Sequence, residues 1–109
     1  MIMLDKLTIL RELKRLLQEH FHDDIKDVIL FGSQAAGTAH EDSDYDVLIV
    51  LNRAYDWKFR DKVSEVIYDL ELKYDILFDT HLISIDELEN SLRGAQPIFR
   101  NALKRGVYA

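Results

Sequence analysis

The sequence predicts one α/β domain of the mixed α+β kind, with a small mixed β-sheet flanked by helices on one side. Three observations support this fold class. The chain has 109 residues, which is the length of a single domain. Two short apolar runs, 28–31 and 47–51, are typical of strands buried on both faces. Segments with apolar residues at three- and four-residue steps precede and follow these runs, which indicates a layered fold of helices on a sheet.

In the first half of the chain, the leucine spacing predicts an amphipathic helix over about residues 4–21, with charged residues between the leucines. The first apolar run then forms a strand that Gly32 closes. Residues 33–43 are small and polar, and they predict a short helical turn followed by a loop. The second apolar run forms the next strand.

In the second half, apolar residues at helical spacing predict a helix over about 57–72, with Asp56 suited to cap its N-terminus. A third strand follows over about 74–83. A capping-box sequence then opens a short helix over about 84–92. A proline begins the last helix, over about 97–106, and a glycine ends it.

Composition excludes several classes of protein. The chain has 14 Lys and Arg against 20 Asp and Glu, a net charge of −6, which argues against generic nucleic-acid binding by phosphate neutralisation. No apolar run approaches the ~20 residues that a membrane span requires, and the charged start excludes a signal peptide. The absence of cysteine fits a reducing compartment. We therefore expect a small, acidic, cytoplasmic protein.

Gly32 and Ser33 leave the first strand where the chain enters a helical turn. Such a bend exposes backbone N–H groups without a side chain that would block a close anion, and helix N-termini attract phosphates. Ser33 adds a hydroxyl group. These two residues are therefore candidates for binding the phosphates of a nucleotide.

Asp44 and Asp46 lie two residues apart at the start of the second strand, so both carboxylates project from one face, about 6.5–7 Å apart along the chain. Two such carboxylates repel each other unless a cation lies between them. Mg²⁺ typically takes one or two carboxylates together with substrate phosphates. Phosphate-binding residues beside a carboxylate pair therefore outline a site for a nucleoside triphosphate with Mg²⁺.

The segment Phe31 to Gly37 (FGSQAAG), followed by Ser43 to Val50 (SDYDVLIV), resembles the signature of the DNA polymerase β-type nucleotidyltransferase superfamily. It is most similar to the minimal nucleotidyltransferase (MNT) domains, and the resemblance covers nearly the whole chain. It implies the polymerase β-like fold, triphosphate binding by Gly32 and Ser33, and two Mg²⁺ ions, or Mn²⁺, on three catalytic carboxylates. Asp44 and Asp46 would supply two of these.

The third carboxylate would come from the next strand, where two aspartates share the polar face with His81. Asp75 and Asp79 are about 13 Å apart in an extended strand, so both cannot reach the same metal ions. By resemblance, the acid lies between hydrophobic residues near the start of the strand. We therefore expect Asp75, with Asp79 as the alternative.

One departure from the family pattern concerns charge. Relatives often carry Arg or Lys in the loop after the Gly-Ser pair, whereas this chain has Gln34, Ala35 and Ala36. Either nucleotide binding is weak, or a cation comes from elsewhere. The candidates in sequence are Arg53, Lys58 and Arg60.

Two functions from different classes follow. The first is a metal-dependent nucleotidyltransferase that moves AMP from ATP to an acceptor hydroxyl, with two Mg²⁺ bracketing the α-phosphate. By resemblance, the acceptor is a HEPN-type toxin partner. The second is an antitoxin-type binding module that neutralises such a toxin by masking it. The apolar faces 7–13 and 98–103 also suggest a homo-oligomer.

Overall fold

The sheet has four strands in the order β3-β2-β1-β4. The computed structural model describes residues 5–32 and 44–109 of the chain. β1 pairs antiparallel with both β2 and β4, whereas β2 pairs parallel with β3. The sheet is therefore mixed, as the sequence predicts. The strands are β1 (Ile25–Phe31), β2 (Tyr45–Leu51), β3 (Phe78–Ser84) and β4 (Val107–Tyr108).

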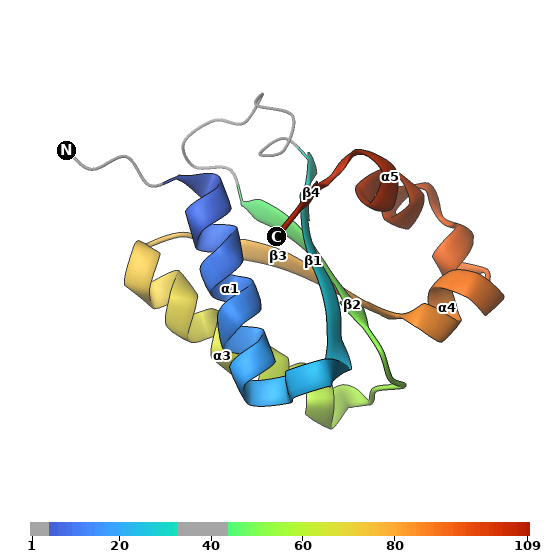
Figure 1. Ribbon diagram of the computed structural model, residues 1–109, viewed down its shortest axis with the longest axis horizontal. Helices are drawn as coiled ribbons and strands as arrows, with labels where there is room; N and C mark the ends of the chain where they lie inside the picture. The colour runs from blue at the N-terminus through green and yellow to red at the C-terminus, as the bar shows by residue number, and fades with distance from the viewer. Residues whose placement is uncertain (1–4, 33–43) are drawn as a thin grey trace.

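Helices cover both faces of this sheet (Figure 1). The two long helices, α1 (Lys6–Phe21) and α3 (Trp57–Tyr74), pack on one face, and the shorter α4 (Ile85–Asn90) and α5 (Pro97–Arg105) pack on the other. The predicted fold class is confirmed, but the expectation of helices on one side is wrong. Alternate residues of a strand point to opposite faces, and both sets are apolar in β1 and β2, so both faces require cover.

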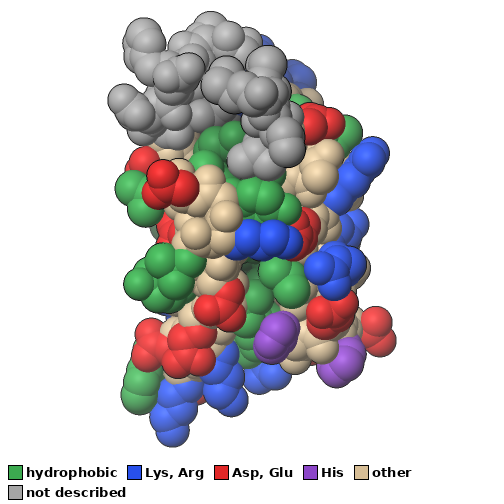
Figure 2. Space-filling view, turned by 90° about the vertical axis from the view of Figure 1, so that its left-hand side faces the viewer, with side chains coloured by type: hydrophobic (Ala, Val, Ile, Leu, Met, Phe, Trp, Pro, Cys, Tyr) green, Lys and Arg blue, Asp and Glu red, His purple; other side chains and the backbone are tan. Residues whose placement is uncertain are grey.

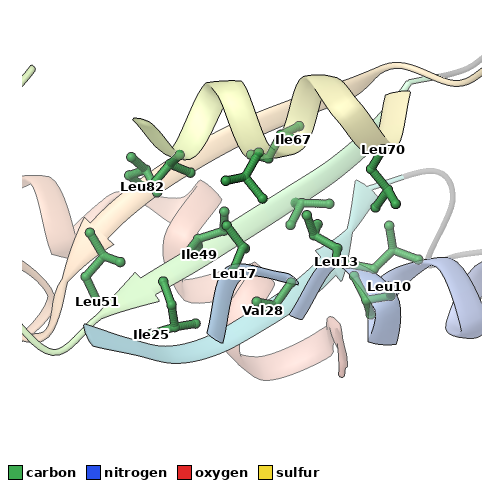
Figure 3. Packing of buried hydrophobic residues seen from close by; sticks show 14 of the residues in the cluster. Leu10, Leu13, Leu17, Ile25, Val28, Ile49, Leu51, Ile67, Leu70 and Leu82 are labelled. Atoms are coloured by element: carbon green, nitrogen blue, oxygen red, sulfur yellow. The ribbon is translucent and has the colours of Figure 1, made fainter. Parts of the chain in front are cut away.

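The larger core lies between the sheet and the two long helices (Figure 3). Leu13 and Leu17 of α1 point onto the sheet beside Val28, and none of the three side chains is accessible to solvent. Ile67 and Leu70 of α3 meet the same cluster. The periodicity that predicts the first two helices therefore marks the surface they bury.

The smaller core lies on the opposite face. Leu48 and Val50 of β2 pack there with Phe99 and Ala102 of α5. Gly106, directly after α5, allows the close approach of this helix to β1, because a Cβ there would overlap Ile29 Cγ2. α5 is thereby held beside the end of β1, as Figure 1 shows.

Most element boundaries agree with the sequence, but the third strand begins later than predicted. α3 continues to Tyr74, Asp75 caps it in the left-handed conformation (φ 53°), and β3 starts only at Phe78. Leu70 and Tyr74 are four residues apart and extend the helical period, which competes with the alternating pattern. The capping box of α4 and the proline at the start of α5 are confirmed. The two-residue strand β4 is too short for any alternation to predict.

Glu12 connects the two long helices. It accepts hydrogen bonds from Lys73 Nζ (2.6 Å) and from the Tyr74 hydroxyl. The hydrogen bond from Lys73, followed by the one from Tyr74, holds the pKa of Glu12 below its usual value of 4.5. A carboxylate whose pKa is lowered by folding stabilises the protein above its unfolded pKa, and this contribution is lost as the pH falls through the folded value.

Glu12→Gln is therefore expected to lower the free energy of unfolding by about 1 kcal/mol at pH 7. The difference from the wild type should shrink as the pH falls below 4.5, the usual value for this carboxyl. Urea titrations at a series of pH values measure both effects. Glu19→Gln is the matched control, because Glu19 pairs with Arg15 of its own helix. A pH-independent loss in Glu12→Gln would contradict the ion-pair account.

The surface shows no field of one charge on the side viewed in Figure 2, where acidic, basic and hydrophobic side chains are interspersed. Leu10, Leu13 and Phe99 are buried within the chain. These three side chains are not available for self-association, whereas Ile98, on the apolar face 98–103, is 39% exposed, so the homo-oligomer stays a prediction. Among the described helices, none is long and apolar enough to cross a membrane.

Candidate active site

Two acidic side chains meet where β2 begins, on the face that α5 partly covers. Asp46 of β2 lies opposite Phe31 of β1 on one side and opposite Asp79 of β3 on the other. Neighbouring strands are about 4.8 Å apart, and residues in register point to the same face. Asp46 and Asp79 are therefore direct neighbours at one end of the sheet.

The electrostatics of this pair are unfavourable for two bare carboxylates. Burial raises the pKa of Asp46 above its usual value, and the hydrogen bond and negative charge of Asp79 raise it further. Asp44 adds a smaller effect in the same direction, and His81 opposes it. Like charges held together in this way indicate a site that a cation would stabilise.

Gly32 forms the wall of the site beside Asp46. It has a positive φ of 72°, and a Cβ at this position would overlap Asp46 Oδ2. Only glycine combines this backbone conformation with room for the carboxylate. The predicted position of Gly32, directly after the first strand and close to Asp46, agrees with the structure.

Gly32→Ala should consequently destabilise the protein by about 1–3 kcal/mol and displace the Asp46 carboxylate. In the Asp46→Ala background the steric part of this cost should disappear, leaving the backbone strain alone. Chemical denaturation of the four proteins in this double-mutant cycle measures the coupling. Equal costs in both backgrounds would show that the glycine and the carboxylate do not interact.

The other groups around the pair are Asp44, His81 and Phe31. Asp44 is exposed just before β2. His81 Nε2 lies 3.5 Å from Asp79 Oδ2, and its ring packs at 5.6 Å from the ring of Phe31. Asp79 and His81 therefore share one face of β3, as the alternation in the sequence predicts.

Asp75 lies elsewhere. It is exposed at the end of α3, three residues before β3 begins. The sequence predicts a strand that starts at about residue 74, but the chain is helical up to Tyr74. Asp79, the alternative, is the residue in register with Asp46. Asp75 lies outside the sheet because α3 is longer than predicted and β3 therefore begins later.

The donor set fits a hard divalent cation that is completed by its substrate. Among the residues described, no group of three or more His, Cys, Asp or Glu side chains is close enough to hold a metal ion alone. Two neighbouring carboxylates are what Mg²⁺ takes when phosphates and water supply its other ligands. Ser33 lies outside the described residues, so its predicted contact with the nucleotide stays a prediction.

A groove of about 510 Å³ begins at Gly32 and follows one face of α5. This volume is in the range of small-molecule sites. No motif in the sequence indicates the groove, because it forms between the end of β1 and a helix some 70 residues later in the chain. Its lining residues are Phe31, Gly32, Ile98, Asn101, Ala102, Arg105 and Gly106.

The cations proposed from the sequence do not lie near this site. Arg53 follows the far end of β2, about 20 Å along the strand from Asp46, where it pairs with Asp24 at 3.4 Å. Lys58 and Arg60 are in the first turn of α3, after that same end. Lys58 lies over the ring of Trp57, and Arg60 lies over the ring of Tyr55.

Comparison with known proteins adds to this geometry. The sequence profile of a family described as "Nucleotidyltransferase domain" matches residues 9–108. "Putative protein adenylyltransferase MJ0141" from Methanocaldococcus jannaschii is 36% identical over 89 residues, which cover 75% of this chain and 90% of the relative.

Two solved structures share the fold. One, described as a "putative minimal nucleotidyltransferase", has a TM-score of 0.58 at 22% identity and covers 95% of both chains. The other is a complex of a tri-AMPylated Shewanella oneidensis HEPN toxin with an MNT antitoxin, with a TM-score of 0.55 at 17% identity, covering 95% of this chain and 71% of that one. At these identities the likeness concerns the fold.

Proposed function

Because this chain belongs to the nucleotidyltransferase domain family, we propose that it transfers AMP from ATP to a hydroxyl group on a partner protein. The observation that carries this proposal is the register of Asp46 with Asp79 beside Gly32. The Methanocaldococcus relative, whose name is "Putative protein adenylyltransferase MJ0141", supports the choice of AMP and of a protein acceptor.

The residues that would hold Mg²⁺ are Asp46, Asp79 and Asp44. We propose Asp79 as the third carboxylate in place of Asp75, because Asp79 is adjacent to Asp46 across the sheet. When bound, Mg²⁺, or Mn²⁺ in its place, would neutralise phosphate charge and lower the pKa of the attacking hydroxyl. The proposal includes two such ions bound at this site.

The chain itself contributes position and electrostatics. Gly32, with no side chain, lets the Asp46 carboxylate lie directly against the backbone at the end of β1, where we propose that the phosphates bind. Desolvation of Asp46 strengthens its attraction for a cation, because a half-buried charge is less screened by water. Ser33 would donate a hydrogen bond to the same phosphates.

The acceptor is proposed to be a HEPN-type toxin. The Asp79 side chain, at the end of the sheet, is 56% exposed. An acceptor supplied by a separate protein has access there. The complex of an AMPylated HEPN toxin with an MNT antitoxin, which shares this fold, supports the choice of partner.

The experiment uses ATP labelled at the α- or the γ-phosphate, with Mg²⁺ and the protein encoded by the neighbouring gene. AMP transfer labels the partner from α-labelled ATP only, whereas phosphoryl transfer labels it from γ-labelled ATP. Mass spectrometry then locates the modified hydroxyl. If the chain neutralises its partner without any label, it is a masking antitoxin and the enzymatic proposal is wrong.

A further inference from the structure

The groove along α5 contains a cationic side chain, Arg105, whereas the loop after Gly32 and Ser33 has no Lys or Arg. Among the described lining residues, Arg105 is the one with a cationic side chain. It has no hydrogen bond or ion pair with any described residue. Other described arginines near the sheet are engaged: Arg93 with Glu87 at 3.0 Å, and Arg100 with the carbonyl of Leu88 at 2.8 Å. Arg105 is therefore available to a ligand.

The groove is continuous with the carboxylate site through Gly32. This glycine lines the groove and contacts Asp46 at the same time. If the phosphates of a nucleotide lie near Asp46 and Asp79, its ribose and base therefore extend into the groove beside α5. Among the described residues, the strand ends that carry Asp46 and Asp79 have no Lys or Arg, so the cation that a triphosphate needs has to come from another element.

We propose, resting on the function proposed above, that this groove is the nucleotide subsite and that Arg105 binds the polyphosphate in place of the missing loop cation. Arg presents several N–H donors in a planar fork that matches phosphate oxygens. Residues 98, 101, 102 and 105 lie at three- and four-residue steps, so a single face of α5 forms the wall of the subsite.

The remainder of the lining suits a purine base. Phe31, Ile98 and Ala102 provide apolar surface, and Asn101 is the one neutral amide that the structure places among them. An amide side chain both donates and accepts, as adenine N6 and N7 require, whereas guanine presents acceptors at the corresponding O6 and N7. Asn101 therefore favours ATP over GTP.

Binding of a non-hydrolysable ATP analogue with Mg²⁺, measured by calorimetry, tests this assignment without depending on turnover. Arg105→Ala should weaken the analogue about 10- to 100-fold, since a hydrogen bond to a charged group is lost, and Arg105→Lys should recover part of it. Adenosine, which has no phosphate, should bind Arg105→Ala and the wild type equally. Asn101→Ala should reduce the preference for ATP over GTP.

Lys104→Ala is the matched control, because Lys104 is the neighbouring cation of α5 and does not line the groove. Unchanged analogue binding in Arg105→Ala, with binding and transfer intact in the wild type, would overturn the subsite and leave the proposed function standing. Equal losses for adenosine and the analogue would also overturn it, since they indicate a structural role. Failure of the wild type to bind the analogue would refute the proposed function itself.

Discussion

Replacing Asp46 by asparagine is expected to reduce AMP transfer at least about a thousandfold, because the substitution removes the central charge of the site without changing its volume. Asp46 is the residue that adjoins Asp79, Asp44 and Gly32 at once. Transfer from α-labelled ATP, measured under single-turnover conditions, gives the size of the loss.

The fold should survive this change. Burial and the neighbouring Asp79 raise the pKa of Asp46, so its ionised form disfavours the folded state at neutral pH. Asp46→Asn removes that charge, and its melting temperature in EDTA should equal or exceed that of the wild type. Mg²⁺ at one hundred times its dissociation constant should stabilise the wild type by about 2.7 kcal/mol and the variant by much less. An equal response to Mg²⁺ in both proteins would contradict the metal site.

The second large effect distinguishes the two candidates for the third carboxylate. Asp79→Asn should reduce transfer about 10²- to 10³-fold, because it removes a proposed metal ligand in register with Asp46. Asp75→Asn should change transfer less than about threefold. It is a suitable control for folding, since asparagine tolerates the left-handed conformation that Asp75 adopts at the end of α3.

Initial rates of labelling at saturating ATP compare the three proteins directly. The prediction for Asp79→Asn also includes a loss of the stabilisation by Mg²⁺, measured by thermal unfolding. A severe loss of transfer in Asp75→Asn, with normal activity in Asp79→Asn, would reverse the assignment.

Much of this fold can be predicted from sequence because its signals are local. The leucine period of α1, the apolar runs of β1 and β2, and the capping box of α4 each specify one element without reference to the others. Gly32 and Asp46 can also be predicted, because each directly adjoins an apolar strand. In the structure the two residues lie against each other, whereas their roles in binding nucleotide and metal stay predictions.

The parts that could not be predicted depend on long-range packing. Asp75 and Asp79 have the same parity, and the choice between them depends on where α3 ends. At that end, Tyr74 donates a hydrogen bond to Glu12 of α1, a contact between residues 62 positions apart in sequence. The groove forms only when α5 packs against β1, so neither Asn101 nor Arg105 has a signal in its own neighbourhood. The placement of α4 and α5 on the second face has the same origin.

The central claim is that Asp46 and Asp79 together bind the divalent cation that transfer requires. Anomalous diffraction from crystals grown with Mn²⁺ and a non-hydrolysable ATP analogue tests it most directly. We predict a peak about 2.0–2.3 Å from an oxygen of each carboxylate, in contact with the analogue's phosphates. A bound analogue with no anomalous peak at these two residues, or with the peak at Asp75, would contradict the account.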